Sequence, residues 1–127
     1  MTSKTKIEFT LPLFVGLVHL APSLNTQRDE HWTAKQKRKD MLKSYFETLH
    51  LPKIYAKYRV SYVRSAIRLL DPIDNLPASM KNIMDVLQEM NLIPEDNHSN
   101  IVLPILSNQL RVHKKKLEQI YVVLEEC

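Results

Sequence analysis

Acidic side chains gather in residues 71–96, a stretch that holds six of the fourteen acids of the chain and one base, Lys81. Asp74 stands just ahead of a predicted helix, Asp85 lies within it, and Asp96 follows a short Leu-Ile-Pro exit. We therefore expect these three carboxylates to converge beside one helix. Two like charges about 4 Å apart repel by roughly 4 kcal/mol at an effective dielectric near 20. A hard divalent cation would remove that cost, so the stretch predicts a metal site.

The ligand types indicate which metal the site would take. Oxygen ligands favour Mg²⁺, with Mn²⁺ as a substitute. Zinc is disfavoured, because Cys127 is the sole cysteine and no two histidines stand at ligand spacing. The single glycine, Gly16, rules out glycine-rich phosphate loops. We expect no organic cofactor.

A helix over residues 78–91 is expected to position these acids. Its apolar residues recur at helical spacing at Met80, Ile83, Met84, Leu87 and Met90. Asp85 then points away from this apolar stripe, and Lys81 lies one turn earlier on the same polar face. In phosphodiester hydrolysis Lys81 would neutralise the charge that develops on the phosphate. The alternative is a plain i, i+4 ion pair between Lys81 and Asp85, worth a few tenths of a kcal/mol.

Positive charge is concentrated outside the acidic stretch. Residues 1–70 hold thirteen Lys and Arg against five acids, and residues 71–100 hold one against six, within a net charge of +4. A basic body around an acidic pocket suits a polyanion held near a metal. Six lysines are the main candidates for DNA contacts: Lys35, Lys39 and Lys43 along one helix, and Lys114, Lys115 and Lys116 at a predicted hairpin tip. The alternative is a solvated surface without function.

The hydrophobic patterns predict an α+β fold. We expect one or two strands with a bulge over residues 7–20, a turn over 21–25, a helix over 33–50 and a long strand over 55–70. After the acidic helix come two strands, over residues 101–112 and 117–124, with Pro104 limiting the first to an edge or a bulge. Together these elements predict a mixed or antiparallel sheet packed with two main helices.

Size and composition bound the class of protein. A chain of 127 residues that is 44% hydrophobic fits one small globular domain spanning residues 1–127. No apolar run reaches about 18 residues, so we expect no membrane span. A single terminal cysteine suggests a reducing compartment, and we expect the protein to be cytoplasmic.

With the acids placed, the chain resembles the RusA family of phage-type Holliday-junction resolvases over nearly its whole length. The strongest part runs from Leu70 to Leu76, then through Lys81 and Asp85, and ends with the sequence Leu-Ile-Pro-Glu-Asp at Asp96. A weaker part contains Pro22, Ser23, Leu24, Asn25, Arg28, His31 and Trp32. Each residue type is common alone, whereas the ordered set is specific.

The resemblance implies a function and a set of site residues. It implies a Mg²⁺-dependent endonuclease of bacterial or phage origin that acts on branched DNA, the four-way junction, during recombination and repair. The metal-binding carboxylates would be Asp71, Asp74, Asp85 and Asp96, and the active-site lysine Lys81. Asn25, Arg28 and His31 would contact DNA. For His31 and Trp32 the residues themselves leave packing under the acidic helix equally open.

Two other classes of function remain open from the sequence. A non-catalytic DNA-binding module would use the acids as turn and cap residues and grip phosphates with its basic surface. A small adaptor or inhibitor would use the acidic helix to bind a protein. Metal-dependent nicking separates the endonuclease from both.

A homodimer is expected, because resolving a junction means cutting two strands related by an approximate two-fold axis. Modest independent support comes from a strand that is apolar at both parities, at Ile101, Val102, Leu103, Ile105 and Leu106. Such a strand needs cover on both faces. The alternative is a monomer in which the helix of residues 33–50 supplies that cover.

Overall fold

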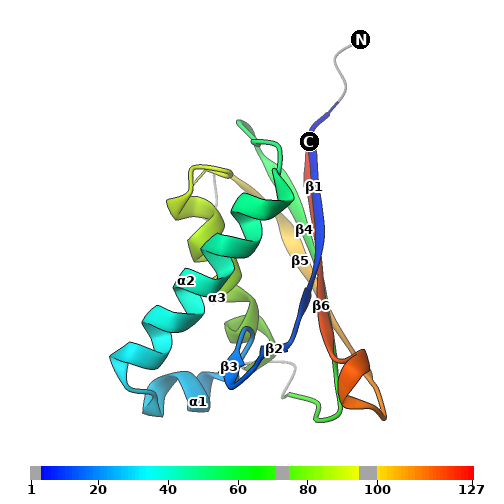
Figure 1. The fold of residues 1–127 in the computed structure, drawn as a ribbon. Coiled ribbons are helices and arrows are strands. Elements are labelled where there is room, and N and C mark those ends of the chain that lie inside the picture. The colour runs from blue at the N-terminus through cyan, green and yellow to red at the C-terminus, as the bar shows by residue number, and fades with distance from the viewer. Residues whose placement is uncertain (1–3, 71–74, 95–99) are drawn as a thin grey trace.

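A four-stranded sheet forms one side of the protein, and the helices pack on one of its faces (Figure 1). The computed structural model describes residues 4–70, 75–94 and 100–127, with only the backbone of Leu24, Asn25, Leu103 and Pro104. In chain order the elements are β1 (Lys6–Pro12), β2 (Phe14–Val15), β3 (Val18–His19), α1 (Leu24–Asp29), α2 (Trp32–Leu49), β4 (Tyr58–Ala66), α3 (Asn75–Glu89), β5 (Ile101–Arg111), the short 3₁₀ helix η1 (Lys115–Leu117) and β6 (Gln119–Glu126).

The sheet is mixed. Its strand order is β1-β6-β4-β5, with antiparallel pairs except between β4 and β5, which are parallel. A parallel pair needs a crossover connection, and α3 provides it. The predicted α+β class with a mixed sheet packed against helices is therefore confirmed.

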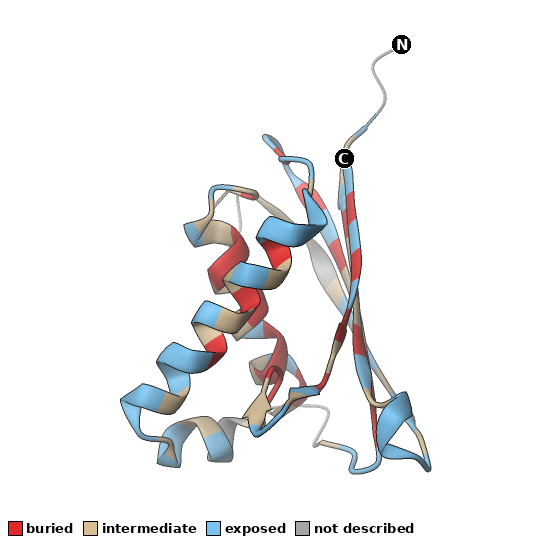
Figure 2. Ribbon diagram, viewed as in Figure 1, coloured by how far each residue is buried: buried red, intermediate tan, exposed pale blue. Residues whose placement is uncertain are grey.

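Alternation along the strands buries one face of the sheet under the helices (Figure 2). In β1 the buried residues are Ile7, Phe9 and Leu11, and the residues between them are exposed. Leu42 and Phe46 of α2, with Ile83 and Leu87 of α3, pack into the same core. The buried face of the sheet therefore packs against the apolar stripes of α2 and α3, and this packing fixes both helices over the sheet.

Backbone conformation explains where the two long helices end. His50 follows α2 with φ 50°, and Asn91 follows α3 with φ 60°. Asparagine and histidine tolerate this left-handed conformation better than most residues. Helix α3 begins at Asn75, three residues ahead of the predicted start at Ala78, and it includes Pro77 in its first turn. Proline is tolerated there because a first-turn N–H has no intrahelical partner.

Three local predictions were wrong or incomplete. The turn predicted over residues 21–25 gives way to α1, because the Ser23 side chain caps that helix by accepting from the Thr26 N–H at 3.2 Å. For residues 7–20 one or two strands with a bulge were predicted, whereas the structure has β1 followed by the β2–β3 hairpin, which turns at Gly16 with φ 59°.

The basic hairpin predicted around Lys114, Lys115 and Lys116 is also wrong. Strands β5 and β6 do not pair, because β4 lies between them, and the lysines lie in a connection that crosses the end of β4. The expected effect of Pro104 is confirmed, since β5 is an edge strand. The register of β4 on β5 also shifts between Arg59 and Ser61.

Within the described ranges, none of the helices is both long enough and apolar enough to cross a bilayer.

Candidate functional site

Polar contacts fix α3, the helix that carries Lys81 and Asp85. The hydroxyl of Tyr62 on β4 and that of Ser79 on α3 lie 3.1 Å apart in the core. The Gln27 side chain of α1 donates to the backbone oxygen of Ala78 at 3.1 Å. The start of α3 is therefore tied to both the sheet and α1.

Lys81 and Asp85 lie on one exposed face of α3, as predicted. Lys81 Nζ is 3.5 Å from Asp85 Oδ1, and the side chains are 66% and 48% exposed. A pair this exposed contributes little to stability. Both groups therefore remain accessible to a ligand arriving from solvent.

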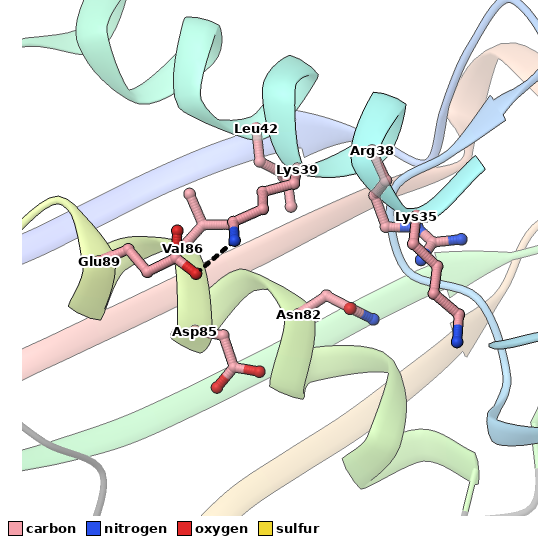
Figure 3. A pocket seen from close by; sticks show the side chains of 8 residues that line it. All are labelled: Lys35, Arg38, Lys39, Leu42, Asn82, Asp85, Val86 and Glu89. Atoms are coloured by element: carbon pink, nitrogen blue, oxygen red, sulfur yellow. Dashed lines mark ion pairs between the residues drawn. The ribbon is translucent and has the colours of Figure 1, made fainter. Parts of the chain in front are cut away.

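Asp85 also lines a pocket of about 170 Å³ between α2 and α3. Figure 3 shows Lys35 and Lys39 projecting from α2, and Asn82, Asp85 and Glu89 from α3, with the Asp85 carboxylate directed away from α2. The Asn82 Nδ2 atom is buried and has no hydrogen-bond partner among the described residues. Asp85 therefore lines one pocket with Lys35 and Lys39, two predicted site residues from another helix, although its carboxylate points away from them.

Glu89 is the partner of two of the predicted DNA-binding lysines. Lys39 Nζ lies 2.6 Å from Glu89 Oε1, and Lys43 Nζ lies 3.3 Å from Glu89 Oε2. Hydrogen bonding from Lys39 is the main cause that holds the pKa of Glu89 below its usual range. The spacing of the lysines was visible in the sequence. Nothing in the sequence indicated that Glu89, which lies on another helix, would pair with Lys39 and Lys43.

We predict that the lysines differ in their contribution to DNA binding. Replacing Lys35, which makes no ion pair among the described residues, with Gln should make the slope of log K against log salt shallower by roughly 0.9 if it contacts a phosphate. Lys53→Gln, in the loop after α2, is the control and should leave the slope unchanged. If removing Lys35, Lys39, Lys43 and Lys114 to Lys116 together leaves the slope unchanged, these lysines are only a solvated surface.

Three of the predicted metal ligands, Asp71, Asp74 and Asp96, lie outside the described residues, so their convergence remains a prediction. Their described neighbours lie at opposite ends of α3 (Figure 1). Asn75 begins that helix, whereas the Pro94 oxygen lies 3.5 Å from the Tyr58 hydroxyl at the start of β4. A helix of 15 residues is about 22 Å long. The described neighbours therefore give no support to one site shared by Asp74 and Asp96.

In the part of the chain that the structure describes, no three His, Cys, Asp or Glu side chains are grouped closely enough to hold a metal ion. The described donors near Asp85 are Glu89, which is bound to lysines, and Asn82. A metal at Asp85 would therefore need further ligands from outside the described residues.

The other predicted DNA contacts are spread over the molecule. Arg28 is exposed in the last turn of α1, and the Asn25 side chain is not described. His31 caps α2 by accepting from the Thr33 N–H at 3.3 Å, and Trp32 is largely exposed, so neither side chain packs under α3. Lys114, Lys115 and Lys116 are exposed, and Lys115 Nζ lies 5.9 Å from the centre of the Phe14 ring.

Gln109 on β5 is a positioning residue that the sequence did not reveal. Its side chain accepts from the Leu70 N–H at 2.8 Å and donates to the Leu70 oxygen at 2.5 Å. Leu70 immediately precedes Asp71, so Gln109 fixes the point at which the chain enters the acidic stretch. A glutamine in a strand carries no distinguishing pattern.

No protein-family model and no curated protein matches this chain.

Proposed function

We propose that the protein is a Mg²⁺-dependent endonuclease that cuts four-way DNA junctions, as its resemblance to the RusA family implies. The observation that carries the proposal is the exposed Lys81–Asp85 pair on α3, beside a pocket to which Lys35 and Lys39 contribute. A cation and a carboxylate accessible on one face, with further cations nearby, suit a phosphodiester held close to a metal.

Each group has a proposed role. Asp85, with Asp71, Asp74 and Asp96, would hold Mg²⁺ or Mn²⁺, which supplies an activated water and offsets negative charge. The Lys81 ammonium would lie against the phosphate and stabilise the charge that grows on its oxygens during attack. Lys35 would bind a neighbouring phosphate and orient the strand.

Incubating the purified protein with a synthetic four-way junction, with and without Mg²⁺, tests the proposal. We expect nicking only with the metal. Asp85→Asn should lower the nicking rate by at least about ten-fold, because even residues around the ligands of a metal have effects of that size. The matched control is Asp40→Asn on α2, an exposed acid, which should nick and bind normally. Absence of metal-dependent nicking would exclude the endonuclease.

A second candidate, a non-catalytic DNA-binding module, is favoured by one observation. Asn75 and Pro94, which neighbour the predicted ligands Asp74 and Asp96, lie at opposite ends of α3. Acids that never meet would act only as turn or cap residues. Salt-dependent junction binding without nicking, in Mg²⁺ or Mn²⁺, would select this candidate.

We also propose a homodimer that uses the sheet face opposite the helices. Leu106 and Leu110 of β5 are 55% and 58% exposed. They lie in register with Ser61 and Ser65 of β4, next to the half-buried Val63. An apolar patch on an edge strand suits a symmetric contact with a second copy. Neither α2 nor α3 covers these leucines, so the helix cover expected for a monomer is absent from this face.

Sedimentation velocity at low protein concentration tests the dimer. We expect the wild type to sediment as a dimer and Leu110→Lys as a monomer. Leu17→Lys, at the exposed tip of the β2–β3 hairpin, should remain a dimer. A dimer should linearise a plasmid with an extruded cruciform in one binding event. A monomeric wild type that releases mostly nicked circles would contradict the proposal.

A further inference from the structure

A second cavity, of about 260 Å³, lies at the C-terminal end of β4 and away from Lys81 and Asp85. The side chains on its wall that carry polar groups are His19, Ser23, Thr26, Arg64, Arg68 and Glu118. Since one water occupies about 30 Å³ of liquid, the cavity has room for a small polyatomic ion and several waters.

Arg64 lines this cavity, and the residue is only 3% exposed. Its Nε donates to the Ala21 oxygen and its Nη1 to the Arg68 oxygen, both at 3.2 Å. Within the described ranges no carboxylate lies within ion-pair distance of it. A guanidinium has five N–H groups, so some of them remain to donate. The Glu118 charge acts on Arg64 from beyond ion-pair distance, so a bound anion would offset more of the cost of burying this cation.

His19 adds a second donor beside Arg64. Its Nδ1 accepts from the Ala21 N–H at 3.1 Å, which places the ring proton on Nε2. Burial, and then the charges of Arg64 and Arg38, lower the pKa of His19 to about 4, so the ring is neutral at pH 7. Nε2 lies 3.4 Å from Arg64 Nη2. In the tautomer that the Ala21 bond requires, Nε2–H and Nη2–H both donate, so an oxygen placed beside these two atoms would accept from both.

The remaining groups on the wall are compatible with a bound anion. The Glu118 carboxylate accepts from the Ile67 N–H at 3.1 Å, so one of its oxygens is occupied by backbone. The two positive charges of Arg64 and Arg68 and the one negative charge of Glu118 give these described wall residues a net charge of +1. Ser23 and Thr26 bring hydroxyl groups that bond to each other at 3.1 Å.

We propose that this cavity binds a phosphate group, held by the Arg64 guanidinium and the His19 Nε2–H, with Arg68 at its mouth. Guanidinium groups match the oxygens of phosphate in geometry and charge. The proposal rests on this cavity alone, and it stands whether or not the protein cuts DNA. The phosphate is either free or part of a DNA backbone, and the two sources are separable.

Inorganic phosphate is the first probe. Titrating it into the 127-residue protein at constant ionic strength should shift the His19 ring resonances and raise the melting temperature, whereas chloride should do neither. Arg64→Ala risks unfolding the protein, so Arg68→Gln is the test variant. It should weaken phosphate binding by about ten-fold, the loss expected for one charge-assisted hydrogen bond. Arg59→Gln, at the other end of β4, makes the same change in charge and should bind phosphate as the wild type does.

Junction DNA is the second probe and distinguishes the sources. We expect junction DNA to displace inorganic phosphate. The His19 resonances should then move away from their phosphate-bound positions. Phosphate that stays bound beside the DNA would overturn the backbone source and assign the cavity to a free phosphate-bearing ligand. The cavity proposal itself is overturned if chloride matches phosphate, or if Arg59→Gln weakens phosphate binding as much as Arg68→Gln.

Discussion

Replacing Lys81 with methionine is expected to slow metal-dependent junction cutting by about a hundred- to a thousand-fold, the scale of removing one group that stabilises developing charge. The effect should fall on the rate of cutting, because Lys81 is proposed to act on charge that appears during attack. Junction affinity should change little, since the other basic side chains remain. Single-turnover cutting of a labelled junction, beside a binding assay, measures both quantities.

The position of Lys81 makes this test clean. Its side chain is largely exposed, and its pair with Asp85 is an i, i+4 contact that contributes only a few tenths of a kcal/mol. The variant should therefore fold as the wild type does. Lys57→Met, an exposed lysine before β4, removes the same charge and should cut normally. If Lys81→Met also cuts normally, Lys81 is only the partner of Asp85 and the proposed mechanism fails.

The sequence was most informative about features that lie within a single helix. The apolar stripe of residues 78–91 predicted a helix that buries Ile83 and Leu87 and exposes Lys81 and Asp85, and the structure has this arrangement. Helical periodicity fixes which side chains share a face without reference to the rest of the fold. The polar face of the candidate site was therefore predictable.

Contacts between elements were not predictable in the same way. The pairing of Lys39 and Lys43 with Glu89 depends on how α2 crosses α3. The order of strands placed β4 between β5 and β6, although neighbours in sequence usually pair. Arg64 is buried in β4, and nothing in the sequence indicated which groups surround it. These features come from tertiary packing, which a periodic pattern does not encode.

The described structure places the neighbours of two predicted ligands far apart, while the convergence of Asp74 and Asp96 themselves remains a prediction. Lys81 and Asp85 share a face as expected, whereas Asn75 and Pro94, next to Asp74 and Asp96, lie at opposite ends of α3. A βαβ crossover has this consequence, because its helix runs back along the strands and separates its two connections. Spacing along the sequence could not reveal it, since the direction of β5 relative to β4 was not predicted.

Replacing Glu30 with alanine is expected to lower the free energy of unfolding by about 3 kcal/mol, the cost of leaving a buried charge without its partner. Glu30 accepts a hydrogen bond from Arg38 Nη2, and Arg38 is buried. The Arg38 Nε also donates to the His19 oxygen at 2.7 Å, which joins α2 to the β2–β3 hairpin. The melting temperature should fall by about 10 °C in a protein of this size. Urea unfolding followed by circular dichroism measures the change.

Two further variants separate the cost of an unpaired charge from a loss of packing. Glu47→Ala removes an exposed acid from α2 and should change stability by less than about 0.5 kcal/mol. The double variant Glu30→Leu with Arg38→Met removes both charges, so it should regain much of the stability that Glu30→Ala loses, since apolar replacements of buried ion pairs are often neutral. Recovery is incomplete if the His19 oxygen then lacks a donor. If Glu30→Ala is no less stable than Glu47→Ala, Arg38 does not depend on Glu30 for its charge balance.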